Sequence, residues 1–280
     1  MKNRPITVSA AEAGAPLDIF LARRLNISRK QAKRLLDERL VFVNGRRTWM
    51  ARHPLQPEDR IEIPGAAAAA PDTVDAPLPI LYRDGNYLVV HKPAGLPTNG
   101  AGSVEERLRR LLRLPAAEAV HRLDRDTTGC LWFALNPASR EIAVALFKER
   151  AVTKTYHAIV AGRIPAAGVT ITDPLDGLPA VTHVKLLSGN PFASHVKILI
   201  ETGRTHQIRK HMASIRHPVL GDKSYLTRDL DDPRLREVPR QMLHASGLAF
   251  PHPATGETIR VKAPLPADFK RTLNRLRLGL

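Results

Sequence analysis

Residues 119–130 read AVHRLDRDTTGC, and this stretch marks the end of an extended segment in a sheet-rich part of the chain. An apolar pair leads into Asp124, which stands between Arg122 and Arg125, and Gly129 then breaks the segment. A carboxylate held between cations is either half of a surface ion pair or a group whose charged form is needed for chemistry. The stretch alone allows both interpretations, so the surrounding sequence has to decide between them.

The chain around this stretch has the pattern of a sheet domain with few helices. Helices are predicted at 103–113 and 137–149. Strands are predicted at 87–92, 130–136, 153–162, 183–189, 194–202 and 257–264. This pattern favours an α+β domain with a mixed, mainly antiparallel sheet over residues 80–280. The glycine-rich nucleotide-binding motifs GxGxxG and GxxxxGK[ST] are absent from the sequence.

A proline-rich and alanine-rich segment precedes this domain. Residues 64–79, PGAAAAAPDTVDAPLP, contain four prolines and no basic residue, which predicts a linker over 65–79. The piece before it, 16–64, has two helical apolar patterns, an Asn-Gly turn between short strands and an alternating strand. The helical patterns are Leu17, Phe20, Leu21 and Leu25, followed by Ala32, Leu35, Leu36 and Leu40. We therefore expect a small N-terminal module, a linker and a larger domain.

The balance of charge points to a polyanionic partner. Lys and Arg total 43 against 27 Asp and Glu, for a net charge of +16. Such an excess suits nucleic acid, and the small module concentrates cations in its second helix, at Arg29, Lys30, Lys33 and Arg34. A solvated helix face is the alternative interpretation of these cations. Aromatic residues are only 5%, so base stacking on an extended aromatic platform is not expected.

Several other classes of protein do not fit the sequence. No apolar run approaches the about 18 residues of a membrane span, and the first residues lack the apolar centre of a signal peptide. The single cysteine, Cys130, makes neither an internal disulfide nor a thiolate zinc site. The spacing of His206, His211 and His217 suits no metal site. We expect a cytoplasmic protein with no metal and no membrane contact.

Four spaced motifs resemble the pseudouridine synthases of the RluA type. They are HRLDRDTTG at 121–129, TKTYHAIVAGRI at 153–164, ETGRTHQIRKHMASIRHPVLGDKSY at 201–225 and RQMLHASGLAFPHP at 240–253. The stretch VVHKPAGLP at 89–97 is similar to the entry strand of that family, and the module at 16–64 resembles an S4 RNA-binding domain. The motifs occur in the family's order, which is far more specific than any one of them.

This resemblance implies a role for several residues. Asp124 corresponds to the catalytic aspartate, Tyr156 to the tyrosine that packs on the flipped uracil, and Arg209 to the arginine paired with the aspartate. Arg122 corresponds to the arginine that enters the RNA where the target base leaves. Arg204 and His206 lie in the same motif as Arg209 and are expected to support the site or bind phosphate.

The resemblance also implies the chemistry and the partner. Conversion of uridine to pseudouridine breaks the N1–C1′ bond and joins C5 to C1′ with no redox change, so no cofactor is expected. The expected partner is RNA, with large-subunit ribosomal RNA favoured over transfer RNA because of the S4-like module, and the expected state is a monomer. The carboxylate would either add covalently or remove a ribose proton, and the sequence does not choose between these routes.

Two different functions remain compatible with the residues taken one at a time. In a protein that binds RNA without catalysis, such as a ribosome-assembly factor, Asp124 would be an ordinary ion-pair partner, Tyr156 a core residue and Asp222 a turn residue. A metal-dependent phosphodiester hydrolase would need clustered acids, which occur only in the polar stretch RDLDDPRLRE at 228–237. Departures from the family pattern at His91, Thr128 and Cys130 leave the proposed catalytic residues untouched but leave the substrate open.

Overall fold

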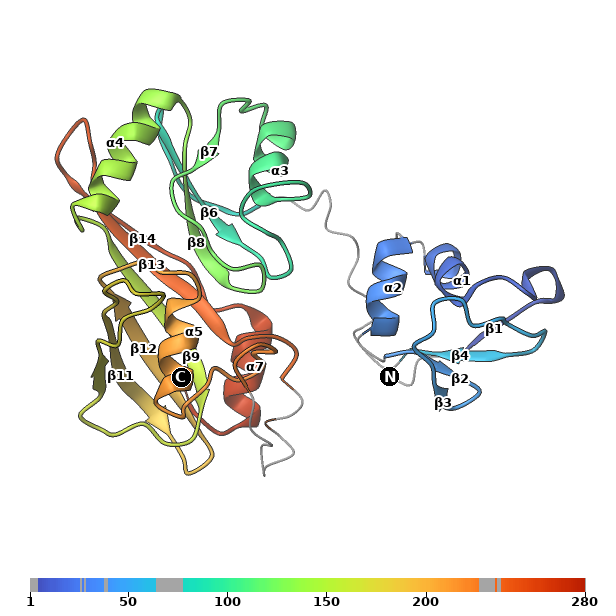
Figure 1. Ribbon diagram of the computed structural model, residues 1–280. Helices are drawn as coiled ribbons and strands as arrows, with labels where there is room; N and C mark the ends of the chain where they lie inside the picture. The colour runs from blue at the N-terminus through green and yellow to red at the C-terminus, as the bar shows by residue number, and fades with distance from the viewer. Residues whose placement is uncertain are drawn as a thin grey trace. The chain divides into compact units, whose positions relative to one another are not determined.

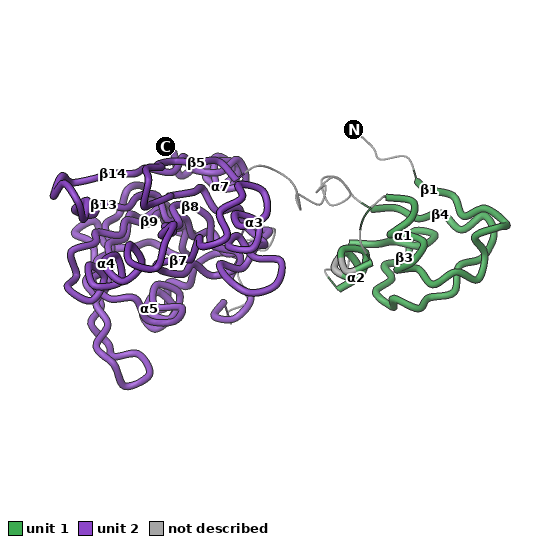
Figure 2. Tube along the Cα trace, turned by 90° about the horizontal axis from the view of Figure 1, so that it is seen from above, with its two compact units in different colours: residues 1–76 green, residues 77–280 purple. Residues whose placement is uncertain are grey.

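The computed structural model describes residues 5–25, 27, 29–37, 40–63, 78–226, 235 and 238–279. The chain divides into two compact units, residues 1–76 and residues 77–280 (Figure 2). Most of the linker predicted at 65–79 lies outside the described residues, as do the side chains of Lys30 and Arg34. Within the described ranges, no helix is long and apolar enough to cross a membrane.

The first unit packs two helices on a small sheet. Its elements are β1 (Ile6–Thr7), η1 (Ala10–Glu12), α1 (Leu17–Arg24), α2 (Arg29–Asp37), β2 (Phe42–Val43), β3 (Arg46–Arg47) and β4 (Arg60–Glu62). The sheet has the order β1-β4-β2-β3. Asn44 and Gly45 both have positive φ, 50° and 75°, as a two-residue turn between paired strands requires. The predicted apolar faces of both helices meet in one buried core that contains Phe20, Leu21 and Leu36.

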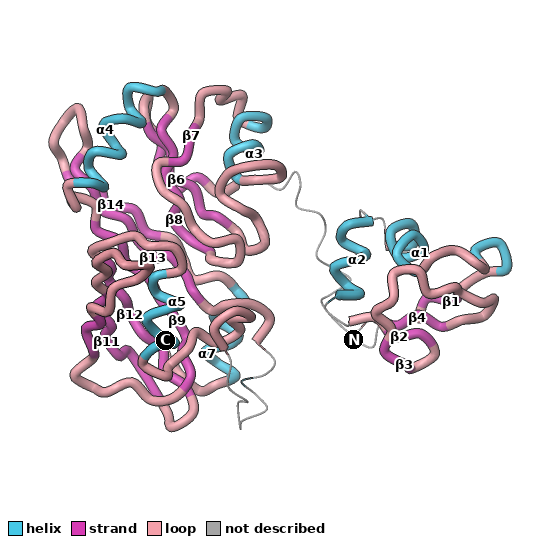
Figure 3. The backbone as a smooth tube through the Cα atoms, in the orientation of Figure 1, coloured by secondary structure: helices cyan, strands magenta, loops and turns pink. Residues whose placement is uncertain are grey.

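The second unit is built on one large mixed sheet (Figure 1 and Figure 3). Its elements are β5 (Ile80–Arg83), β6 (Tyr87–Lys92), α3 (Val104–Leu111), β7 (Glu118–Ala119), β8 (Thr128–Ala134), α4 (Pro137–Lys148), β9 (Thr153–Ala161), β10 (Val169–Ile171), β11 (Thr182–Gly189), β12 (Ala193–Ile200), α5 (Gln207–Ser214), β13 (Leu243–Pro251), β14 (Thr258–Lys262) and α7 (Ala267–Arg275). The strand order is β10-β11-β12-β9-β13-β8-β6-β5, with β14 on β13 and β7 on β8. The α+β fold class is confirmed.

The sheet is joined at its centre by β13, which pairs with three strands. It runs parallel to β8 and antiparallel to β9 and β14. Where β8 and β13 meet, a Cβ on Gly129 would lie 2.1 Å from the carbonyl oxygen of Ala245, and Gly129 has φ of 116°. Only glycine fits so close an approach of two backbones. The glycine that follows the HRLDRDTT segment therefore lets the two halves of the sheet join.

Different helices cover the two faces of the sheet. Ile208 and Met212 of α5 pack on the face that presents Tyr156 and Ala158 of β9. Phe269 and Leu273 of α7 pack with Ile159, on the opposite face of the same strand. The start of α5 thereby comes close to the loop between β7 and β8, which carries Asp124.

Candidate active site

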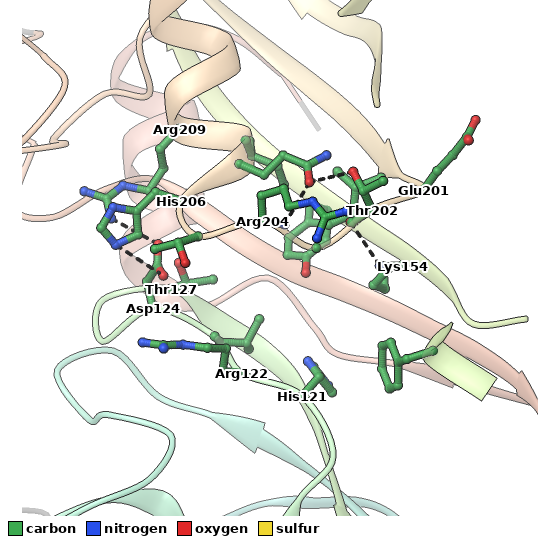
Figure 4. Close-up of a pocket in the computed structure, with 18 of the residues that line it drawn as sticks. His121, Arg122, Asp124, Thr127, Lys154, Glu201, Thr202, Arg204, His206 and Arg209 are labelled. Carbon is green, nitrogen blue, oxygen red and sulfur yellow. Dashed lines mark hydrogen bonds and ion pairs between the residues drawn. The ribbon is translucent and has the colours of Figure 1, made fainter. Parts of the chain in front are cut away.

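A cavity of about 520 Å³ opens on the α5 face of the sheet (Figure 4). Its lining comes from the loop before β8, the end of α4, the start of β9 and the segment that leads from β12 into α5. This size lies within the range of pockets that hold a small ligand. Six residues singled out from the sequence line it together, namely Arg122, Asp124, Tyr156, Arg204, His206 and Arg209.

Asp124 is paired with Arg209, from a helix 85 residues further along the chain. Nη1 of Arg209 donates to Oδ2 of Asp124 at 3.0 Å, and the Asp124 side chain is 20% exposed to the cavity. The guanidinium is itself buried, at 7% exposure. The acid therefore faces a distant arginine rather than making an ion pair with its neighbours Arg122 or Arg125.

A second carboxylate fixes the guanidinium in place. Asp222 accepts from Nε of Arg209 at 2.6 Å and from Nη2 at 2.8 Å, and its side chain is fully buried. Burial alone would raise the pKa of Asp222, but the hydrogen bond from Arg209 and the backbone amide of Ser224 hold this pKa below its ordinary value. For the cation Arg209 the signs are reversed. Burial alone would lower its pKa, but hydrogen bonds and charges from Asp222, followed by those from Asp124, raise it. Both groups are therefore ionised at neutral pH.

The turn that follows α5 supports this arrangement. The backbone amides of Ser224 and Tyr225 donate to Oδ1 of Asp222 at 2.9 and 3.2 Å, and the guanidinium of Arg209 lies over the Tyr225 ring. Gly221, with φ of 76°, approaches the carbonyl of Arg240 so closely that a Cβ would lie 2.0 Å from its oxygen. Asp222 is therefore a turn residue, as one interpretation of the sequence had it, and also the anchor of Arg209.

His206 faces the other oxygen of Asp124. Its Nε2 lies 3.7 Å from Oδ1 of Asp124, and its Nδ1 lies 3.0 Å from the hydroxyl of Tyr225. A donor at Nε2 suits the carboxylate, so we assign the proton to Nε2, and Nδ1 then accepts from the tyrosine. The backbone of His206 has φ of 57°, a left-handed conformation that costs a non-glycine residue about 1–2 kcal/mol. Strain of this kind is typical of functional sites.

The backbone of the loop around Asp124 is held from several sides. Thr98 exchanges two hydrogen bonds with the backbone of Leu123, and Lys92 donates to the carbonyl of Arg125 at 2.7 Å. Arg240 donates to the carbonyl of Asp126 at 3.0 Å. These contacts come from two separate parts of the chain, the end of β6 with the segment that follows it and the loop before β13, so the position of Asp124 does not depend on its own ion pair alone.

Two of these supports, Lys92 and Arg240, are cations that lie in the quoted motifs but whose burial the sequence did not indicate. Lys92 is fully buried, and burial lowers its pKa to about 7. Arg240 is held by a bidentate pair with Asp268 at 2.7 and 3.0 Å. A Lys next to Pro93 and an Arg in a loop look like surface residues in a sequence, because burial of a cation depends on tertiary contacts.

Tyr156 forms part of the apolar wall beside Asp124. It lies on β9 next to Ile198 of β12 and Ala245 of β13 and is 7% exposed. Burial, and then the charge of Asp124, raise the pKa of the phenol above its ordinary value, so it is neutral at physiological pH. A flat, neutral ring beside an ionised carboxylate is a suitable surface for a planar base.

At the other end of the cavity lie Lys154, the ring of His121 and the carboxylate of Glu201 (Figure 4). Phe147 lies there against Lys154, Arg150 pairs with Glu201, and Lys148 also lines the cavity. Burial, followed by the nearby charge of Lys154, lowers the pKa of His121 to about 4, so this ring is neutral. Arg122 stands exposed at the rim, and no partner for its guanidinium occurs among the described residues.

The remaining predicted RNA-binding residues belong to the first unit. Arg29 donates to buried Asp18 at 2.7 Å while its side chain stays 58% exposed, and Lys33 is exposed. The predictions for Lys30 and Arg34 concern side chains outside the described part. In the described ranges, no cluster of three His, Cys, Asp or Glu residues suits a metal ion. The acidic stretch 228–237 lies almost entirely outside those ranges.

Comparison with known proteins gives consistent matches. A family model for RNA pseudouridylate synthase matches residues 86–214, and an S4 domain model matches residues 16–61. Ribosomal large subunit pseudouridine synthase D of Haemophilus influenzae is 34% identical over 97% of this chain and 95% of its own. The protein of the same name from Xanthomonas campestris is 37% identical over 75% of this chain and 72% of its own.

Solved structures resemble this chain over about three quarters of its length. Human RNA Pseudouridylate Synthase Domain Containing 4 aligns with a TM-score of 0.63 at 26% identity and covers 72% of this chain and 94% of its own. Human RNA Pseudouridylate Synthase Domain Containing 1 aligns with a TM-score of 0.59 at 30% identity and covers 75% of this chain and 98% of its own.

Proposed function

Since this chain belongs to the RluA-type family of RNA pseudouridine synthases and is an isomerase of RNA uridine, we propose that Asp124 carries the reaction and that the substrate is large-subunit ribosomal RNA. The observation that carries the assignment is the ion pair between Asp124 and buried Arg209, next to Tyr156, in one cavity. The named function of the relatives at 34% and 37% identity supports the choice of RNA.

The charges around Asp124 suit its part in the reaction. The reaction cleaves N1–C1′, turns the uracil and forms C5–C1′, after which the proton on C5 leaves to water. An ionised carboxylate is needed, either to add covalently or to remove a ribose proton. The buried guanidinium of Arg209 lies 3.0 Å from Oδ2 of Asp124 and faces the carboxylate in the cavity. Nε2 of His206 lies 3.7 Å from Oδ1, which is beyond hydrogen-bond distance, so this oxygen faces the cavity without a hydrogen bond from His206.

The remaining residues position the nucleotide in this proposal. Tyr156 packs against the uracil, and Arg122 enters the RNA at the place the base has left, since it is exposed at the rim of the cavity. Arg204, whose Nε donates to the carbonyl of Pro179 at 3.1 Å, borders the cavity between its two ends. Arg29 and Lys33 of the S4-like unit contact phosphates elsewhere on the RNA.

We further assign the enzyme to the cytoplasm, where ribosomal RNA is made and modified, and expect it to act as a monomer. The supporting observation is that every proposed catalytic residue comes from the second unit of one chain. Such a site needs no residue from a second copy.

Release of tritium from C5 of uridine tests the proposal, because that hydrogen must leave when C5 joins C1′. Purified protein, in chelator and with no nucleotide added, should release tritium from labelled large-subunit ribosomal RNA in proportion to the pseudouridine formed. Labelled transfer RNA serves as the comparison substrate. The variant Asp124→Asn should lower release by about a hundredfold or more while RNA affinity stays within a few-fold. Release by this variant at near the wild-type rate would overturn the role of Asp124.

A further inference from the structure

Lys154 is a buried cation that faces the cavity but has no part in the chemistry described above. The residue is only 8% exposed, and its Nζ donates a hydrogen bond to the carbonyl oxygen of Thr202 at 3.1 Å. An ammonium has three donors, and this one hydrogen bond uses one of them. Among the described residues, no carboxylate lies within ion-pair distance of Nζ. The carboxylate of Glu201, which also lines the cavity, pairs with Arg150 and His183 instead.

Burial of a cation without a negatively charged partner costs free energy, and the lowered pKa of Lys154 reflects this. Burial lowers the pKa of Lys154 to about 8, with no opposing contribution from an acid. The group is still largely protonated at neutral pH, so its positive charge is present in the cavity. Phe147, whose ring centre lies 5.6 Å from Nζ, compensates only in part. The site therefore needs an anion from outside the chain.

The position of Lys154 fits one particular anion. Lys154 and Tyr156 lie two residues apart on β9, so both project from the same face of the strand. In Figure 4, Lys154 lies at the end of the cavity away from Asp124, with Thr202 and Arg204 between them. A uracil on Tyr156 thus leaves the amine of Lys154 beside the backbone of the same RNA strand. Lys148 and Arg150 also line the cavity and are exposed, and Arg150 pairs with Glu201.

We propose that Lys154 binds a single backbone phosphate next to the target uridine and so forms a phosphate subsite inside the catalytic cavity. This inference rests on the proposed function, because it needs an RNA strand in the cavity. A phosphodiester supplies the missing negative charge and acceptors for the free donors of Nζ. A uracil carbonyl would accept a hydrogen bond but would leave the buried charge uncompensated. Lys154 acts here in binding and orientation, with no step of bond exchange.

Removal of the charge tests the subsite. The variant Lys154→Met keeps an unbranched stem over Phe147 and loses the ammonium. Its control is Lys197→Met, which makes the same change of charge on β12, at a position that pairs with His157 and so lies on the opposite face of the sheet. The substrate is the fragment of large-subunit ribosomal RNA in which the wild-type enzyme releases tritium.

We expect Lys154→Met to raise KM about tenfold or more, as loss of a charge-assisted hydrogen bond does, with kcat at saturating RNA little changed. Lys154→Arg should restore most of the affinity, and Lys197→Met should change KM little. Equal effects of Lys154→Met and Lys197→Met would show that only overall charge matters and would overturn the subsite.

A chemical change in the RNA provides a test that needs no variant. A neutral methylphosphonate is placed at each of the phosphates that flank the target uridine, one at a time. One of them should weaken wild-type binding about as much as Lys154→Met does, and should have no further effect on that variant. No weakening from either position, or full additivity with Lys154→Met at both, would refute the proposal. Tritium release by the wild type reports separately on the proposed function.

Discussion

The variant Asp222→Asn should separate the anchoring of Arg209 from the chemistry of Asp124. The carboxylate of Asp222 accepts four hydrogen bonds, at 2.6 and 2.8 Å from Arg209 and at 2.9 and 3.2 Å from the amides of Ser224 and Tyr225. Asparagine keeps one acceptor oxygen and turns an amide donor toward a guanidinium that is also a donor. A buried cation then loses its bidentate partner and keeps only the ion pair with Asp124.

The expected cost follows from that geometry. Breaking a buried ion pair by removing one partner destabilises by about 3–5 kcal/mol, and we expect Asp222→Asn to fall in this range at pH 7. A guanidinium free to shift by about 1 Å should also lower kcat by about 10- to 100-fold, since misplacement on this scale has such effects. RNA affinity should change little, because Asp222 is fully buried and touches no solvent.

Acid should reduce the difference between the variant and the wild type. The pKa of Asp222 is lowered in the folded state, so its stabilising contribution is present above the unfolded value and is lost as pH falls through the folded value. Asparagine has no such titration. The difference in the free energy of unfolding should therefore be largest at neutral pH and should shrink below about pH 4.

Urea unfolding of a single-tryptophan form measures the difference in the free energy of unfolding for the second structural unit, which contains Asp222. Trp132 is buried in the second unit and Trp49 lies in the first, so a Trp49→Phe background leaves a reporter for the catalytic unit. The control is Asp176→Asn, which removes an exposed partner of Lys210 on the same helix as Arg209 and should leave the midpoint nearly unchanged. A loss below about 1 kcal/mol for Asp222→Asn, or one that persists unchanged into acid, would refute the anchoring role.

The remaining predictions concern His206 and the first unit. His206→Asn should lower kcat, because asparagine cannot place a donor where Nε2 lies. The melting temperature should stay equal or rise, because asparagine tolerates the left-handed backbone at φ of 57° better than histidine does. A fall in both kcat and the melting temperature would indicate a purely structural role. Deletion of residues 1–64 should weaken RNA binding and flatten its salt dependence by about 0.7–0.9 units of slope per lost phosphate contact, as measured by filter binding. An unchanged slope would show that the cations of α2 are a solvated face.

The sequence predicted local features of this molecule better than distant pairings. Strand β6 and helix α4 were placed within a residue or so, because their apolar runs are bounded by turn residues. Strand β13 and helix α5 were not predicted as elements. The sequence of β13, LHASGLAFP, is rich in small residues with no clear alternation, since this strand contacts three others and is covered on both faces. Such a role is decided by the whole sheet.

The candidate site shows the same division. The loop with Asp124 stood out from its own motif, but its pairing with Arg209 followed from family resemblance alone, as no local pattern connects residues 85 positions apart. The turn role of Asp222, one alternative from the sequence, involves local bonds to Ser224 and Tyr225, whereas its bonds to Arg209 are distant and left no local pattern. Lys92, Lys154 and Arg240 lie in the quoted motifs, but the sequence did not show that they are buried, since burial of a cation depends on tertiary contacts.

Lys92 and Arg240 help to explain why Asp124 and Arg209 are each held by contacts other than their own ion pair. The backbone of its loop is fixed by Thr98, Lys92 and Arg240, none of which touches the carboxylate. The guanidinium that faces the carboxylate is fixed by Asp222, which does not touch the loop. Each partner is thus held in position before they meet, so the ion pair between them need not supply the order itself. If Asp124 carries the reaction as proposed, the loop keeps its place even when the carboxylate gives up its contact with Arg209.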